Sequence, residues 1–281
     1  MTVTSNVAVP QTYFLRLVAT LAASVTQLVR APSHSRRAEA ARRSARHGLW
    51  LATGTGALII VLMYLLDATE IGLMPPRGTA SLWPVRILTD FGKSAYVLWA
   101  LAGMSFMVLV VSAAARGTAR SLLLGLGTRL QFLFFAVLLP VLTGEVLKWA
   151  VGRGRPFVGG EANAFNFSHF AGTEAYASFP SGHAVTSFAL AFGVSALWPR
   201  ARIAMLVYAV VIAATRLVLL AHHPSDVVAG ALVGVIGAMF VRYWFAARRL
   251  GFAIGRDGTV VPLPGPSLER FKRVARSPFG P

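Results

Sequence analysis

The sequence predicts an all-α integral membrane protein, a bundle of six transmembrane helices with an N-terminal interfacial amphipathic helix. Three observations predict this class. The 281 residues are 56% hydrophobic and only 13% charged, which is too apolar for a soluble domain of this length. The apolar residues gather in six runs, most of them near the ~20 residues that a bilayer core requires. The Lys and Arg residues flank those runs.

The six runs define the expected spans. They are Leu49–Leu66, Ala95–Ala115, Leu130–Leu147, Ala184–Leu197, Ile203–Ala221 and Val227–Val241. The fourth and sixth are short, so their ends must extend into polar flanks or the bilayer must thin around them. The spans place a membrane domain at residues 48–247, between a basic arm at 1–47 and a basic tail at 248–281.

The arm contains an amphipathic segment at Thr12–Val29. Its apolar residues recur at helical spacing between Arg16 and Arg30, but the segment is too short and too interrupted to span a bilayer. We interpret it as a helix that lies in the membrane interface. A cytosolic helix packed on the domain fits the pattern equally well.

The distribution of positive charge predicts the orientation. Six spans put both termini on one side, and that side carries 20 of the 27 Lys and Arg residues against 7 on the other. The positive-inside rule therefore predicts a multi-pass protein of the cell inner (plasma) membrane with cytoplasmic termini. No cleavable signal peptide is visible. The net charge of +17 comes without a nucleic-acid-binding signature, so we exclude nucleic acid as a partner and expect anionic lipid near the basic runs.

Arg216 is an unusual residue for its position. It lies six residues before His222 at the end of the fifth run, about 9 Å below the membrane surface at ~1.5 Å per residue. An arginine at that depth is costly unless it has a partner, which makes it a functional-site candidate. The alternative is an internal ion pair, for which Glu145 in the third run is available.

Three separate stretches bring polar residues to the side opposite the termini. They are KWAVGRGRP at 148–156, SFPSGH at 178–183 and TRLVLLAHHPSDVVAG at 215–230. The residues that they contribute are Lys148, Arg155, Ser181, His183, Arg216, His222 and Asp226. Three cations and a hydroxyl, without a facing carboxylate cluster, are typical of an anion site, because guanidinium groups match tetrahedral oxyanions.

Helix ends add to this anion site. The residues after Gly182 are apolar at helical spacing, so Ser181 and Gly182 fall at a helix N-terminus, whose free N–H groups favour phosphate. Glycine there permits close backbone approach. By the same reasoning, Ser225 after Pro224 is predicted to cap the last span.

Two histidines and an aspartate add chemistry to binding. A neutral imidazole can attack phosphorus when a carboxylate fixes its tautomer and steadies the cation that forms, and a second, protonated imidazole can donate a proton to the leaving oxygen. Zinc bound by His183, His222, His223 and Asp226 is the competing interpretation. Three cations sharing the site would repel a metal, so we expect none. The chain has no cysteine, which excludes disulfides and thiolate metal sites.

The three stretches resemble the signature of the type 2 phosphatidic acid phosphatase (PAP2) superfamily, which also includes vanadium haloperoxidases. Its pattern is K-x6-R-P, then P-S-G-H, then S-R-x5-H-x3-D. The first two match in full and the third has threonine for serine, at Lys148…Arg155-Pro156, Pro180-Ser181-Gly182-His183 and Thr215-Arg216…His222…Asp226. The match covers about residues 90–245 and leaves out the arm and the tail.

The resemblance implies a role for each matched residue. His222 would be the nucleophile that forms a phosphohistidine, Asp226 would orient it, and His183 would be the general acid. The phosphoryl oxygens would be held by Lys148, Arg155, Ser181, Gly182 and Arg216. No cofactor and no metal is implied.

We therefore expect a bacterial membrane lipid phosphatase with its active site outside the cytoplasm. Substrates implied by the resemblance are a polyprenyl diphosphate, phosphatidate or phosphatidylglycerol phosphate, or the glycolipid anchor of an outer membrane. Phosphotransfer between lipids at the same site is one alternative. A lipid-phosphate transporter or binding protein is another, although a transporter would place its charges near the midplane within internal repeats.

Overall fold

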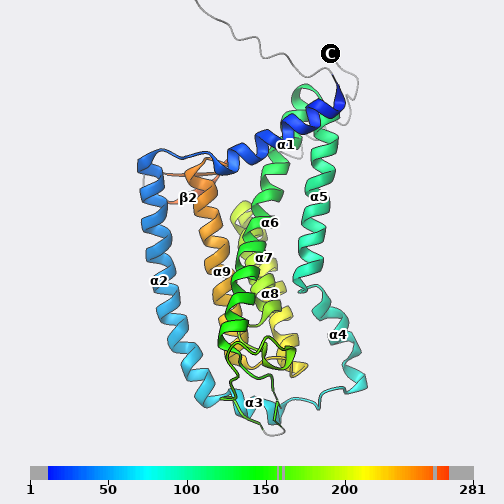
Figure 1. Ribbon diagram of the computed structural model, residues 1–281, viewed down its shortest axis with the longest axis vertical. Helices are drawn as coiled ribbons and strands as arrows, with labels where there is room; N and C mark the ends of the chain where they lie inside the picture. The colour runs from blue at the N-terminus through cyan, green and yellow to red at the C-terminus, as the bar shows by residue number, and fades with distance from the viewer. Residues whose placement is uncertain (1–11, 157, 160–161, 256–257, 266–281) are drawn as a thin grey trace, which may run out of the picture.

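The computed structural model describes residues 12–265 except 157, 160–161 and 256–257. Residues 1–11 of the predicted arm and 266–281 of the predicted tail lie outside this description. The described chain is all-α, apart from two short strands (Figure 1). Its helices are α1 (Tyr13–Val29), α2 (His34–Leu65), α3 (Asp67–Leu73), α4 (Trp83–Asp90), α5 (Ser94–Ala114), α6 (Gly117–Val151), α7 (Gly182–Leu197), α8 (Arg202–Val218) and α9 (Pro224–Ala247).

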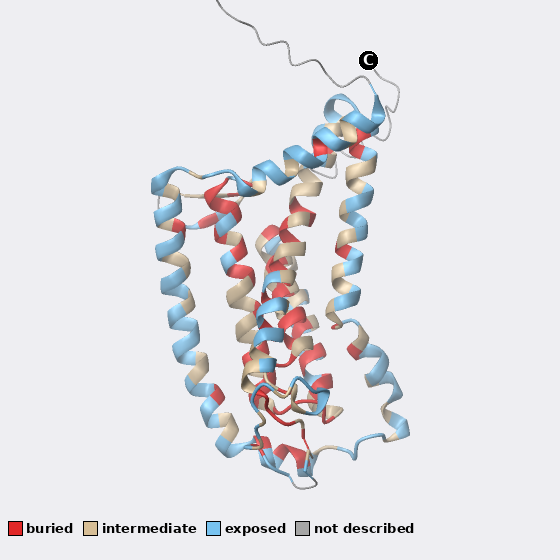
Figure 2. Ribbon diagram, viewed as in Figure 1, coloured by how far each residue is buried: buried red, intermediate tan, exposed pale blue. Residues whose placement is uncertain are grey.

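Five stretches of the described chain are long and apolar enough to cross a membrane, so this is a multi-pass membrane protein. They are His34–Leu65, Ala80–Ala114, Gly117–Val151, Pro199–Val218 and Pro224–Ala247. The predicted fourth span is α7, which has only 16 residues, so the count of six is not confirmed. Because α7 packs among α6, α8 and α9, half of its residues are buried by protein rather than exposed to lipid (Figure 2).

Helix α1 forms where the amphipathic pattern predicts it. Thr12 is its N-cap, and the Thr12 hydroxyl accepts a hydrogen bond from the backbone of Leu15. The helix lies across the ends of α5, α6 and α9 (Figure 1), where the Tyr13 hydroxyl donates to the carbonyl of Val110 and the Trp244 indole donates to that of Leu28. Phe14 on the opposite face is 68% exposed. One face of α1 therefore packs on the domain, as the second interpretation expects, and the other face leaves apolar residues exposed, as an interfacial helix requires.

The basic arm is more regular than its composition indicates. Helix α2 begins at His34 and continues without a break through Gly48 into the first apolar run, so the predicted boundary at residue 47 lies inside one helix. At the other end of the chain, strands β1 (Phe252–Ile254) and β2 (Val260–Pro262) form an antiparallel ribbon beyond α9. Phe132 of α6 contacts both Phe245 and Phe252, which anchors this ribbon to the core.

Glycines let α9 approach α7 closely. A Cβ atom on Gly234 would lie 2.4 Å from the Val185 carbonyl oxygen, and one on Gly230 would lie 2.5 Å from that of Ser181. The four-residue spacing of the two glycines puts both on one face of α9, an arrangement that lets helix backbones meet in membranes. This contact brings the start of α7 against the start of α9 at the end of the molecule opposite α1 (Figure 1).

Candidate active site

A cavity of about 310 Å³ opens at this end of the bundle. The residues of the predicted site that line it are Lys148, Arg155, Gly182, His183, Arg216 and His222. Ser181 and Asp226, also predicted, are fully buried next to these lining residues. The structure therefore brings together the three stretches that sequence analysis selected.

His222 is held in one tautomer by the backbone. Its Nδ1 lies 2.8 Å from the carbonyl oxygen of Ser178, and because a carbonyl only accepts, Nδ1 carries the proton. The Nε2 atom is then left with its lone pair. Burial lowers the pKa of His222 well below its ordinary value, and the charges of Arg216 and Arg155 lower it further. The imidazole is consequently neutral near pH 7, which is the state that a nucleophile requires.

Asp226 acts on His222 through Ser178. One Asp226 carboxylate oxygen accepts hydrogen bonds from the Ser178 hydroxyl at 2.6 Å and from the His223 backbone at 2.8 Å. The backbone carbonyl of Asp226 accepts from the amide of Ser181 at 2.9 Å. Asp226 thus fixes the segment whose carbonyl orients His222, and it also fixes the start of α7.

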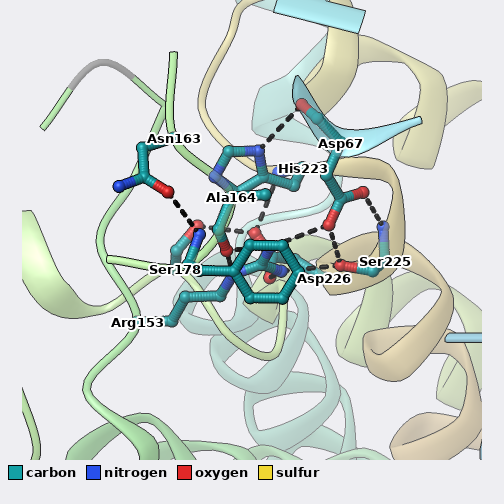
Figure 3. Close-up of polar contacts among 9 residues, drawn as sticks. Asp67, Arg153, Asn163, Ala164, Ser178, His223, Ser225 and Asp226 are labelled. Atoms are coloured by element: carbon teal, nitrogen blue, oxygen red, sulfur yellow. Dashed lines mark hydrogen bonds and ion pairs between the residues drawn. The ribbon is translucent and has the colours of Figure 1, made fainter. Parts of the chain in front are cut away.

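Arg153 and Asp67 complete this buried network, and sequence analysis did not select either residue. Arg153 forms ion pairs with Asp226 at 2.6 Å and with Asp67 at 2.7 Å, and it donates to the Ala164 carbonyl (Figure 3). Asp67 accepts from both the backbone and the hydroxyl of Ser225. Arg153 lies inside the KWAVGRGRP stretch, which was the available signal. Asp67 follows the first apolar run with no motif around it.

The predicted N-cap of the last span is corrected by this network. Helix α9 begins at Pro224 with His223 as its N-cap, two positions earlier than the predicted cap Ser225. The Asp226 side chain reaches back to the His223 backbone in a capping box. Ser225 is instead bonded to Asp67 and Arg153, which explains why it does not cap.

The start of α7 presents two unsatisfied polar atoms next to the cavity. Ser181 Oγ and His183 Nε2 are buried and have no hydrogen-bond partner within the described chain. A Cβ atom on Gly182 would lie 3.0 Å from Lys148 Nζ, so glycine lets the lysine approach the helix N-terminus. Buried atoms without partners are costly, and a bound oxyanion and a leaving-group oxygen would satisfy both.

The cations of the cavity have identifiable partners. Arg216 donates to the Thr89 hydroxyl at 2.8 Å, and not to Glu145 as the ion-pair alternative required. Glu145 instead pairs with Lys148 at 2.5 Å. Arg155 pairs at 2.8 Å with Glu174, whose side chain is 93% exposed. Two acids that sequence analysis did not select therefore line the cavity, and each is already paired with a cation.

The turn between α4 and α5 supplies a wall that sequence analysis missed. Lys93 lines the cavity as a fourth cation and pairs with Asp90 at its outer side. A Cβ atom on Gly92 would lie 2.4 Å from the Ile212 side chain and 3.1 Å from the His183 ring. Glycine at this position therefore allows the turn to close against the proposed general acid.

Within the described chain, no group of three or more acidic, histidine or cysteine side chains has the arrangement to hold a metal ion. His223, one of the four candidate ligands, directs Nδ1 toward the Asp67 carbonyl at 3.4 Å and caps α9. What the geometry provides is a buried nucleophile candidate, a second imidazole and four cations around a single cavity.

Comparison with known proteins agrees with this chemistry. The profile of the PAP2 superfamily matches residues 129–250, which contain all three motifs, and the chain belongs to this superfamily. It is a PAP2-type lipid phosphatase, a phosphoric monoester hydrolase.

Two similar proteins are lipid A 1-phosphatases. That of Rhizobium johnstonii is 33% identical over 204 residues, 71% of this chain and 82% of the relative. That of Rhizobium etli is 33% identical over 206 residues, 71% of this chain and 86% of the relative. An Escherichia coli K12 protein provisionally named as an undecaprenyl-diphosphatase, YbjG, is 39% identical over 100 residues, 33% of this chain and 47% of the relative. No solved structure matches the chain significantly.

Proposed function

We propose that this protein hydrolyses a phosphate monoester of a membrane glycolipid at the extracytoplasmic face of the inner membrane. The reaction would pass through a phosphohistidine on His222. The observation that carries the mechanism is the tautomer of His222. Its Nδ1 is committed to the Ser178 carbonyl, which leaves Nε2 as the nucleophile beside a cavity with four lining cations.

In the first step, Nε2 of His222 attacks phosphorus and the ester bond to the lipid oxygen breaks. His183 gives its proton to the departing oxygen, so the lipid leaves as an alcohol. Lys148, Arg155 and Arg216, with the N–H groups at the start of α7, stabilise the charge on the phosphoryl oxygens. Asp226 supports the imidazolium that forms by holding Ser178 in place.

In the second step, water attacks the phosphohistidine. His183, now neutral, takes a proton from that water as the N–P bond breaks, and His222 regains its lone pair. The product is inorganic phosphate, and the site returns to its starting protonation. Both steps use the same cations, because the five-coordinate phosphorus has similar charge in each.

The glycolipid assignment is supported by the two relatives named as lipid A 1-phosphatases, each similar over 71% of this chain. A polyprenyl diphosphate is the second candidate, and the match to YbjG favours it over 33% of this chain. Lys93 fits either substrate, since a fourth cation beside the phosphoryl site can bind a further anionic group.

Phosphate release by the purified full-length protein tests the proposal. Lipid A, undecaprenyl diphosphate, phosphatidate and phosphatidylglycerol phosphate are compared at equal surface concentration in mixed micelles. We expect the highest kcat/KM on lipid A, inhibition by vanadate and full activity in chelator. Phosphate release from only the other lipids would overturn the glycolipid assignment, and activity restored by zinc after chelation would overturn the metal-free mechanism. Transfer of phosphate to an added lipid alcohol, without release, would identify a phosphotransferase.

A further inference from the structure

Helices α1, α2 and α9 come together at the end of the molecule opposite the active site (Figure 1). A second cavity lies in this corner. Its volume is about 370 Å³. The wall is apolar on the α9 side, where Phe240, Trp244 and Ala247 face the cavity, and on the α2 side, where Ala40 and Ala41 do. This cavity shares no lining residue with the active site.

Arginines border the cavity, and none of its described lining residues is acidic. Arg37 from α2 and Arg248 from the end of α9 are its charged lining residues, within the described chain. Arg248 is only 7% exposed, and its Nε atom has no hydrogen-bond partner among the described residues. Burial lowers the pKa of Arg248, and the positive charges of Arg37 and Arg30 lower it further, so the three guanidinium groups repel one another.

The acidic residue nearest to Arg37 in the sequence does not neutralise the positive charge beside the cavity. Glu39 lies on α2, but its carboxylate is bonded to Arg42 and Arg43. The arginine cluster therefore keeps an excess of positive charge, which a bound anion would offset.

The apolar wall ends in an aromatic group at the level of the arginines. The guanidinium of Arg248 stacks over the Trp244 ring, 3.6 Å from its centre, and the Trp244 indole donates to the Leu28 carbonyl. A tryptophan with its ring among apolar residues and its N–H bonded to the chain is typical of the membrane interface, where head groups meet acyl chains.

We propose that this cavity binds one anionic phospholipid from the leaflet opposite the catalytic face, with its phosphate between Arg37 and Arg248 and an acyl chain against Phe240 and Ala41. Charge complementarity selects an anionic head group, and the apolar wall selects a molecule that carries a chain. A basic pocket between membrane helices is a recognised form of such a site. The bound lipid would tie the start of α2 to the end of α9.

Native mass spectrometry of the full-length protein tests this site. Dioleoyl phosphatidylglycerol, dioleoyl phosphatidylcholine and inorganic phosphate are titrated separately against the protein in detergent. We expect a saturable single site for phosphatidylglycerol, weaker binding of phosphatidylcholine and no detectable binding of inorganic phosphate. Each arginine near the head group should raise the affinity about fivefold. Arg37→Gln/Arg248→Gln removes both, so it should weaken phosphatidylglycerol binding roughly thirtyfold.

Two further variants keep the test decisive. Arg200→Gln/Arg202→Gln removes the same charge from exposed positions outside the cavity and should leave the affinity unchanged. Ala41→Leu keeps both arginines but fills the cavity, so it should also weaken binding, and it decides the outcome if the arginine variant fails to fold. Unchanged phosphatidylglycerol binding in Ala41→Leu and in Arg37→Gln/Arg248→Gln would overturn the proposal, as would equal affinity for phosphatidylcholine.

Discussion

His222 and His183 have different surroundings, so their removal should have different consequences. His222→Ala should abolish turnover of every substrate, because the proposed mechanism forms its covalent intermediate on Nε2 of His222. His183→Ala removes only proton transfer, which typically contributes ~10²–10⁴-fold. That loss should be largest for alkyl monoesters and smaller for aryl esters or diphosphates, whose leaving groups need less protonation.

Single-turnover kinetics measure the rate of the first step, phosphoryl transfer to His222, separately from hydrolysis of the phosphohistidine. Equal losses on all leaving groups would show that His183 acts by binding. Appreciable activity in His222→Ala would contradict the covalent mechanism.

Arg153 should act as a positioning residue for Asp226. Arg153→Lys keeps the charge but removes the planar fork that reaches Asp67 and Asp226 together. We expect kcat to fall by roughly tenfold to a hundredfold with little change in KM, since the lost contact lies outside the cavity. Breaking a buried pair also costs about 3–5 kcal/mol, so thermal unfolding is measured in parallel.

Arg86→Lys makes the same change at an exposed position and serves as the control. A rise in KM with unchanged kcat in Arg153→Lys would indicate that Arg153 binds substrate directly.

Glu70 of α3 should make stability depend on pH. Its side chain is buried, and neither carboxylate oxygen has a partner within the described residues. Burial, with the charges of Asp67 and Asp226, raises the pKa of Glu70 to about 7 from an ordinary 4.5. The folded state therefore keeps a proton that the unfolded state loses, and this contribution to stability is complete below pH 4.5 and is lost as the pH rises through about 7.

Thermal unfolding of Glu70→Gln in detergent checks this effect. The variant should be more stable than the parent at pH 8, by at most about 3 kcal/mol, and the gain should shrink toward pH 5. Glu39→Gln is the control, because it makes the same change at a carboxylate that is paired with Arg42 and Arg43. A gain for Glu70→Gln of equal size at pH 5 and pH 8 would exclude titration of Glu70 as its cause.

At the scale of elements, the contact of α7 with α9 positions the chemistry. Gly234→Ala places a methyl group 2.4 Å from the Val185 carbonyl oxygen, so the two helices must separate. We expect a loss of stability of about 1–3 kcal/mol. Activity should fall by more than tenfold, because α7 carries His183 and α9 carries Asp226.

Gly56→Ala on α2 is the matched control, since no atom lies within 4 Å of the added methyl group. Melting temperature and kcat, measured on both variants, separate the helix contact from the general effect of adding alanine. Equal behaviour of the two variants would show that α9 tolerates displacement from α7.

Five of the six predicted spans correspond to long apolar stretches, and these were predictable because apolar runs of bilayer length have few alternatives to helix. The bounds were less predictable, since nothing in the composition of the arm reveals that α2 starts at His34, and tertiary packing rather than length determines α7. The motif residues of the site were also predictable, because their spacing is fixed along the chain. Asp67 was not predictable, because its contact with Arg153 joins residues 86 positions apart.

For the whole molecule, the two ends differ in chemistry. Helix α1 and the strand ribbon lie at one end of the molecule (Figure 1), together with the arginine-bordered cavity. The candidate active-site cavity and the Arg153 network lie at the other end. The exposed apolar face of α1 adds a surface suited to lipid at the second end. The proposed chemistry and the proposed lipid site thus lie at opposite ends of the molecule.

This polarity makes the orientation testable without reference to the number of spans. Ser81, between α3 and α4, is exposed at the catalytic end, and Ser35, at the start of α2, is exposed at the opposite end. The chain has no cysteine, so Ser35→Cys and Ser81→Cys each introduce a single thiol. The basic asymmetry of 20 to 7 predicts that an impermeant maleimide labels Ser81→Cys in intact cells, and labels Ser35→Cys only after the inner membrane is disrupted. Phosphate release by each variant confirms that the labelled protein is folded. Labelling of Ser35→Cys alone in intact cells would place the chemistry in the cytoplasm, and the glycolipid substrate would then have to be dephosphorylated before it leaves the inner leaflet.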